Sequence, residues 1–87
     1  MAEKDDFAAA QERVKALSRR PSNDELLRLY GLYKQALDGD ATGSRPGILD
    51  PKGRAKFDAW SALRGTSPAE SRRRYVALVE ELVRKHG

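Results

Sequence analysis

Cysteine is absent from this sequence of 87 residues. The chain therefore forms no disulfide bond and offers neither a thiol nucleophile nor a cysteine-ligated zinc site. The lack of cysteine is compatible with the reducing cytoplasm, which is the compartment we expect. Histidine is nearly absent as well. The single His86 lies beside the last residue, where we expect a frayed end, no partner for the ring, and no catalytic or metal-binding role.

Long apolar runs are also missing. None approaches the roughly 18–20 residues that a membrane-spanning helix requires. The first residues, MAEKDDFAAAQERVKAL, are charged and lack the apolar centre of a secretory signal, so we expect none. Charged residues make up 34% of the chain and hydrophobic residues 39%, which is typical of a globular helical domain. We expect residues 1–87 to form one domain.

The net charge is only +4, because 13 acidic residues offset 17 basic ones. A basic excess favours anionic partners such as nucleic acid, anionic lipid or a phosphorylated small molecule. DNA readers concentrate arginine and lysine on one recognition helix. The helix predicted over residues 22–38 holds only Arg28 and Lys34, and the arginine run at residues 72–74 is typical of a solvated face. Nucleic-acid binding is therefore the weaker alternative, and we expect no nucleic acid partner.

The spacing of apolar residues predicts an all-α chain without strands. Helices are predicted over residues 5–17, 22–38, 50–63 and 67–85. The apolar stripe of the first helix consists of Phe7, Ala10, Val14 and Leu17. That of the last helix consists of Tyr75, Leu78, Val79 and Leu82. We expect a four-helix bundle around a small core, with Trp60 as an anchor between helices.

Capping signals mark three of the helix starts. The sequence SNDE at residues 22–25 is a capping box, and SPAE at residues 67–70 combines a cap, a proline and a glutamate. In DPKG at residues 50–53, aspartate is the cap and proline the first helical residue. The loop between the second and third helices is the longest and has room to span the bundle, so these two helices can run parallel. Within it, Pro46 and Gly47 predict a type II turn.

The second helix divides into three sectors at about 100° per residue. Leu29, Leu32 and Ala36 form an apolar sector. The polar sector consists of Asp24, Arg28, Gly31 and Gln35. The third sector is mixed and consists of Leu26, Leu27, Tyr30, Tyr33, Lys34 and Leu37. A bundle helix needs one apolar stripe, so the mixed sector requires another explanation.

Two interpretations of the mixed sector compete. In the first, Tyr30 and Tyr33 are half-buried core aromatics and Lys34 is an ordinary surface lysine. In the second, the sector lines a ligand groove, since tyrosine offers a flat ring and a hydroxyl while lysine suits phosphate. Periodicity alone favours the first interpretation. The accompanying Lys56 and Tyr75 favour the second.

The order of motifs resembles that of the acyl-coenzyme A binding protein family over nearly the whole chain, from Phe7 to about His86. The motifs are YGLYKQALDGD at residues 30–40, RPGILDPKGRAKFDAWSALRGTS at residues 45–67 and the tyrosine that opens YVALVEEL at residues 75–82. Two departures stand out: Phe57 replaces the family's usual tryptophan, and Pro51 replaces a frequent aromatic residue. The resemblance implies an up-down-down-up four-helix bundle that binds medium- and long-chain acyl-CoA esters without catalysis. It also favours a stand-alone carrier that forms an acyl-CoA pool in fatty acid metabolism.

The resemblance also implies roles for individual residues. Tyr30, Tyr33 and Lys34 would contact the nucleotide end of CoA, Lys56 the ribose 3′-phosphate, and Tyr75 the adenine site. Lys15 and Lys52 would contact the ligand more peripherally. Leu26 and Leu27 would lie beside the acyl chain. No cofactor or metal is implied beyond the ligand, for example palmitoyl-CoA. The implied protein is a monomer with transient contacts to membranes and to acyl-CoA-using enzymes.

The chemistry of the ligand fits these residue types. Stacking of adenine on an aromatic ring contributes on the order of 1–3 kcal/mol. Phosphates form strong charge-assisted hydrogen bonds with lysine. At about 0.8 kcal/mol per buried methylene, a long acyl chain could contribute up to roughly 10 kcal/mol before entropy losses. An acyl-CoA-processing enzyme is the remaining alternative. We do not expect one, because no residue pair has the context of a nucleophile with its base or of a general acid and base.

Overall fold

The computed structural model describes residues 3–87, with side chains described from Asp6 onward. The helices are α1 (Glu3–Lys15), α2 (Asn23–Asp38), α3 (Pro51–Ser61) and α4 (Pro68–His86). No strand occurs within these residues, which confirms the all-α prediction. Two predicted helix ends were too late. The α1 helix gives way at Ala16 and Leu17 to tighter turns, and residues 62–65 form turns after α3.

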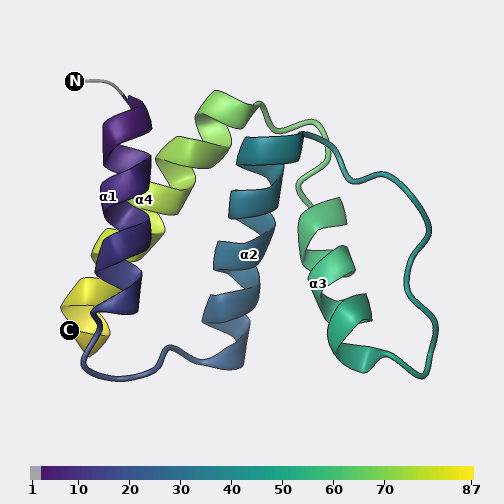
Figure 1. Cartoon of the computed structure of the whole chain (residues 1–87), viewed down its shortest axis with the longest axis horizontal. Coiled ribbons are helices and arrows are strands. Elements are labelled where there is room, and N and C mark those ends of the chain that lie inside the picture. Colours follow the sequence, from purple (N-terminus) through teal and green to yellow (C-terminus); the bar gives the residue numbers. More distant parts are fainter. Residues whose placement is uncertain (1–2) are drawn as a thin grey trace.

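The helices follow the up-down-down-up order, and α2 and α3 run parallel (Figure 1). The loop of residues 39–50 makes this possible by running from the end of α2 to the opposite end of the molecule, where α3 begins. In space α1 packs against α4, α4 against α2, and α2 against α3. The molecule extends 37 × 28 × 14 Å, so it is little thicker than one helix with its side chains. Helix α3 lies at one side and, among the described residues, packs against no helix other than α2.

All three predicted caps are confirmed. The backbone amide of Glu25 donates to Ser22 Oγ (3.1 Å), and the Glu25 carboxylate accepts from the amide of Ser22 (2.8 Å). Ser67 Oγ accepts from the amide of Glu70 (3.1 Å). Asp50 Oδ1 accepts from the amide of Gly53 (3.0 Å). A Cβ atom at Gly53 would collide with the Asp50 carboxylate, which explains a glycine in the first turn of α3.

The core lies between α1, α2 and α4 and contains both predicted apolar stripes. Phe7 and Tyr75 pack edge to face, with ring centroids 5.0 Å apart, and Tyr33 stacks on Phe7 with ring centroids 6.1 Å apart. The buried core residues are Phe7, Ala10, Leu29, Leu32, Ala36, Tyr75, Leu78, Val79 and Leu82. Helix α3 contributes no buried residue. The core therefore depends little on α3.

Two residues assigned to the polar sector of α2 are buried. Gln35 is fully buried, and its amide nitrogen donates to Asp40 Oδ1 (2.8 Å) and to the carbonyl of Thr66 (2.9 Å). Gly31 is buried where α2 meets α3. A Cβ at Gly31 would lie 2.7 Å from the carbonyl oxygen of Ala59. The sector prediction was wrong here because the contacts that bury both residues come from distant parts of the chain.

The predicted turn at Pro46 and Gly47 was also wrong. The amide of Asp50 donates to the carbonyl of Gly47 (3.0 Å), so Ile48 and Leu49 occupy the centre of the turn. Gly47 does not adopt the positive φ that the third residue of a type II turn requires. The turn is placed instead by Asp50, which closes it and caps α3 at the same time.

His86 has a partner, contrary to the expectation of a frayed end. Its Nε2 lies 2.9 Å from one carboxylate oxygen of Glu25, and Lys85 Nζ lies 2.9 Å from the other. Hydrogen bonds from Lys85, from the Ser22 amide and from His86 lower the pKa of Glu25 to about 2. One carboxylate thus caps α2 and binds the end of α4.

Replacing Gly31 with alanine should destabilise the fold by about 1–2 kcal/mol, because overpacking at the Ala59 carbonyl outweighs the gain in helix propensity. Chemical denaturation measures the change. Gly47→Ala is the matched control, since its Cβ would meet nothing within 4 Å and should change stability by less than about 0.5 kcal/mol. A Gly31→Ala protein more stable than wild type would mean that α2 and α3 do not approach so closely.

Glu25→Gln should remove an acid-sensitive part of the stability while leaving the capping hydrogen bonds possible. Because the folded pKa lies below the ordinary 4.5, this stability is complete above about pH 4.5 and is lost as pH falls toward 2. Urea midpoints at pH 7 and pH 2.5 test this. The urea midpoint of wild type should exceed that of the variant at pH 7, and the two midpoints should converge at pH 2.5. Glu12→Gln, in an exposed pair with Lys15, is the control and should behave as wild type.

Candidate functional site

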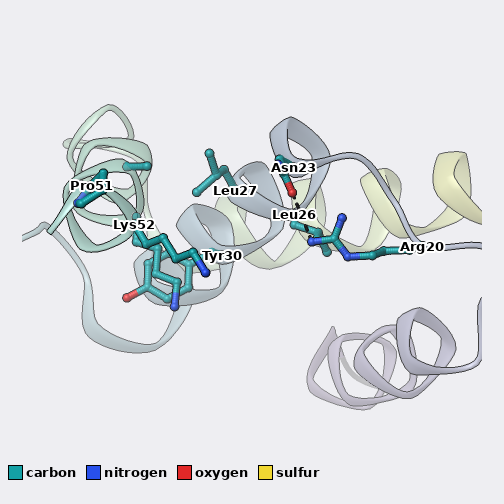
Figure 2. A pocket seen from close by; sticks show the side chains of 9 residues that line it. Arg20, Asn23, Leu26, Leu27, Tyr30, Pro51 and Lys52 are labelled. Carbon is teal, nitrogen blue, oxygen red and sulfur yellow. Dashed lines mark hydrogen bonds between the residues drawn. The ribbon is translucent and has the colours of Figure 1, made fainter.

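A groove of about 410 Å³ lies between α2 and the start of α3 (Figure 2). Apolar side chains line its middle, and amide, aromatic and cationic groups surround them. Its lining residues are Arg20, Asn23, Leu26, Leu27, Tyr30, Pro51, Lys52, Ala55 and Lys56. Five of the nine predicted site residues are therefore together in one groove: Leu26, Leu27, Tyr30, Lys52 and Lys56.

The two lysines and the tyrosine ring meet at one end of the groove, and Arg20 lies at the other (Figure 2). Lys52 and Lys56 are one helical turn apart on α3, and both are exposed. Lys56 Nζ lies 5.4 Å from the centre of the Tyr30 ring, at a distance typical of a cation–π contact. Lys52 lines the same groove. A flat ring with one ammonium group beside it and a second lysine in the same groove can hold a planar group that carries phosphate.

Lys34 lies outside the groove lining. Its Nζ is 2.6 Å from Asp38 and 4.8 Å from the centre of the Trp60 ring. The hydrogen bond with Asp38 raises the pKa of Lys34, so the side chain is a cation at neutral pH. The charge of Lys34 is thus partly engaged by its own helix.

Tyr33, Tyr75 and Lys15 are separate from the groove lining as well. Tyr75 is only 6% exposed, and burial raises the pKa of its hydroxyl. Tyr33 is half-buried, and its ring centre lies 6.4 Å from that of Tyr75. Lys15, at the end of α1, is exposed and lies 3.4 Å from Glu12. Tyr75 lies in the core between α1, α2 and α4, and Tyr33 packs against it.

Trp60 connects α3 to the loop of residues 39–50. Its indole nitrogen donates to the carbonyl of Gly39 (2.7 Å), and its ring packs at an angle against Phe57 with centroids 6.4 Å apart. Asp40, next along the loop, accepts hydrogen bonds from Gln35 and from the amide of Gly65 (2.8 Å each). These bonds lower the pKa of Asp40. The far ends of α2 and α3 are joined here.

Sequence reasoning missed three groove residues: Arg20, Asn23 and Ala55. Arg20 precedes a proline in the α1–α2 loop and donates to Asn23 Oδ1 (3.1 Å), the dashed bond in Figure 2. The position of Ala55 between Lys52 and Lys56 was the available signal, since it shares their side of α3. Pro51, noted as a departure at the start of α3, forms part of the groove edge.

A second hollow, of about 370 Å³, lies on the other side of the α2–α3 contact. It is mostly apolar, and Leu27 separates it from the groove. Its lining residues are Leu27, Arg28, Leu32, Ala59, Ala62, Leu63 and Arg74. None of the predicted tyrosines and lysines lines it, so the groove at Tyr30 is the better candidate.

Other kinds of site find little support in the described part of the chain. Among its described residues there is no group of three histidine or acidic side chains arranged to hold a metal ion. None of the four helices is both long and apolar enough to cross a membrane. The groove between α2 and α3 therefore remains the main candidate for function.

Comparisons with known proteins agree with the motifs. The family profile described as "Acyl CoA binding protein" matches residues 4–79. The acyl-CoA-binding protein of Dictyostelium discoideum is 49% identical over 80 residues, which cover 92% of this chain and 95% of that protein. Acyl-CoA-binding protein homolog 1 of Caenorhabditis elegans is 51% identical over 83 residues, which cover 95% and 93%.

Solved structures give the same result. The crystal structure of Oryza sativa acyl-CoA-binding protein 2 superposes with a TM-score of 0.90 at 41% identity, covering 95% of this chain and 90% of that one. The crystal structure of the protein from Moniliophthora perniciosa gives a TM-score of 0.89 at 39% identity and covers 98% and 83%. The sequence motifs, the order of the helices and these relatives agree: the chain belongs to the acyl-CoA-binding protein family.

Proposed function

We propose that this protein binds medium- and long-chain acyl-CoA thioesters without transforming them and serves as an intracellular carrier and pool former. The observation that supports this most directly is the groove between α2 and α3. It combines an apolar middle with a tyrosine ring and two lysines at one end. That arrangement matches a ligand with an apolar tail, a planar base and phosphates.

The groove residues divide between the two halves of the ligand. Tyr30 offers its ring to the adenine, where stacking contributes on the order of 1–3 kcal/mol. Lys56 and Lys52 bind phosphate through charge-assisted hydrogen bonds. Leu26 and Leu27 cover the acyl chain, for which burial contributes about 0.8 kcal/mol per methylene. Because head group and tail both contribute, the ester should bind more tightly than CoA or the fatty acid alone.

The remaining predicted residues would act around this centre. Tyr75 is too buried to offer a face to adenine, so it would support the half-buried ring of Tyr33, which lies nearer the surface. Lys34 would meet phosphate by leaving Asp38 or by sharing its protons. Lys15 would contact the ligand only peripherally, since it is exposed at the end of α1.

A catalytic role is not part of the proposal. The groove lining contains no serine, threonine, histidine or carboxylate. The groove lining thus offers no histidine or carboxylate to act as a base for its tyrosine or lysines. We propose that the carrier acts as a monomer in the cytoplasm and has acyl-CoA-using enzymes as transient partners.

Calorimetric titration with palmitoyl-CoA, CoA and palmitate tests the proposal. The ester should bind in a one-to-one complex, with both fragments at least about 100-fold weaker. No heat with the ester would contradict the carrier function. Hydrolysis of the thioester above a buffer blank over several hours would contradict the non-catalytic role.

Single substitutions in the groove should separate the head-group and tail contributions. Lys56→Ala should weaken the binding of both palmitoyl-CoA and free CoA by about tenfold or more, since a charge-assisted hydrogen bond is lost. Leu27→Ser should weaken the binding of palmitoyl-CoA while changing the affinity for free CoA by less than about twofold. Arg64→Ala is the matched control for Lys56→Ala, because it removes an exposed cation outside the groove lining. Equal losses in Lys56→Ala and Arg64→Ala would indicate nonspecific charge attraction.

Asp38→Asn should strengthen binding of free CoA by about two- to fivefold if Lys34 contacts phosphate, because its 2.6 Å carboxylate partner is neutralised. Isothermal titration at low and high salt measures the gain, which should shrink as salt rises. Asp24→Asn, which neutralises an exposed carboxylate in the first turn of α2, serves as the control. No gain in Asp38→Asn would remove Lys34 from the set of phosphate ligands.

A further inference from the structure

Two neighbouring aliphatic side chains project into solvent at the turn before α3. Ile48 is 80% exposed and Leu49 is 95% exposed. They are adjacent in sequence and occupy the centre of one turn, so they form a small continuous apolar tip. Single exposed apolar residues are normal on a protein surface, whereas two held together at the centre of one turn are a candidate contact site.

The turn is held in place on both sides. Before it, the guanidinium of Arg45 makes two hydrogen bonds with the carboxylate of Asp58 on α3 (2.9 and 2.8 Å). Directly before the turn, the carbonyl of Pro46 accepts a hydrogen bond from Arg54 of α3 (3.4 Å). After it, Asp50 closes the turn and caps α3. The exposure of Ile48 and Leu49 therefore follows from a turn fixed to α3 at three points.

The surroundings of the tip are basic. The segment of residues 45–58 contains four basic and two acidic residues, a net charge of +2. Both acids are engaged, Asp50 as a cap and Asp58 with Arg45. Lys52 and Lys56 are exposed, and they line the groove that begins directly after the turn at Pro51. The apolar tip is thus followed directly in the chain by Pro51 and Lys52, which line the groove.

We propose that Ile48 and Leu49 are a docking tip that inserts into the surface of an anionic phospholipid bilayer. Aliphatic side chains enter the boundary between head groups and acyl chains, while nearby lysines face anionic head groups. Two side chains and modest charge give weak, reversible binding, as a carrier that must leave the membrane requires. The proposal rests on the proposed function, because docking here brings the groove to the surface where long-chain thioesters partition.

Co-sedimentation with vesicles free of acyl-CoA tests the tip. Wild type should bind vesicles of phosphatidylcholine with phosphatidylserine, and bind vesicles of phosphatidylcholine alone at least about fivefold more weakly. The double variant Ile48→Ser, Leu49→Ser should lower the partition coefficient about tenfold. Leu37→Ser is the matched control, since it removes an exposed leucine (57%) from the end of α2 and should change binding less than about twofold.

Three outcomes would overturn the docking tip: no binding of wild type to anionic vesicles, unchanged binding of the double variant, or an equal loss in Leu37→Ser. Titration with palmitoyl-CoA in solution distinguishes a failure of the docking tip from a failure of the proposed carrier function. The double variant should bind the ester as wild type does, because neither residue lines the groove. If wild type fails to bind the ester, the carrier function fails, and the vesicle result still decides whether the tip docks.

Discussion

The close approach of α2 and α3 at Gly31 is the contact on which the groove depends. With no side chain at this position, the backbone of α2 approaches the carbonyl of Ala59 closely. The two helices run parallel, and the middle of α2 meets α3 near its end, with a hollow on either side of the contact. Leu27 lies between these hollows, and Tyr30 faces the one beside Lys56. A larger residue at 31 would move α3, and with it both groove lysines, away from the Tyr30 ring.

A parallel pair of helices needs a long connection, and this connection is secured at each end of α3. At the far end, Trp60 binds the carbonyl of Gly39, while Asp40 accepts hydrogen bonds from Gln35 and Gly65. The two-bond ion pair between Arg45 and Asp58 also holds the loop to the last turn of α3. At the near end, Asp50 caps α3 and Arg54 donates to the carbonyl of Pro46. These hydrogen bonds and the close contact at Gly31 together place the groove lysines.

Local chemistry explains which features the sequence alone could reveal. The caps at residues 22, 50 and 67 depend on residues three positions apart, so their signals are complete within four letters. The stripes of α1 and α4 follow from period alone. Gln35 looked like a surface residue because its partner Thr66 is 31 positions away. His86 looked unpartnered for the same reason, since Glu25 is separated from it by 61 positions.

The same distinction applies to the site. Residues of α2 and α3 that share one helical face, such as Leu26 with Tyr30 and Lys52 with Lys56, could be grouped from spacing. The separation of Tyr33, Tyr75 and Lys34 from that groove could not, because it depends on how α4 and Trp60 pack. The family resemblance assigns all these positions to one ligand, whereas the packing buries Tyr75 in the core and leaves Tyr30 in the groove lining.

The arrangement of α3 has a consequence for dynamics. The main core joins α1, α2 and α4, whereas α3 has one helical neighbour and no buried residue. Elements with few buried contacts open at lower free energy than the core does. A ligand that spans α2 and α3 would add contacts where the fold has fewest, and its binding free energy would stabilise that element directly. A groove on the least buried helix can therefore admit a long, flexible molecule without disturbing the core that keeps the protein folded.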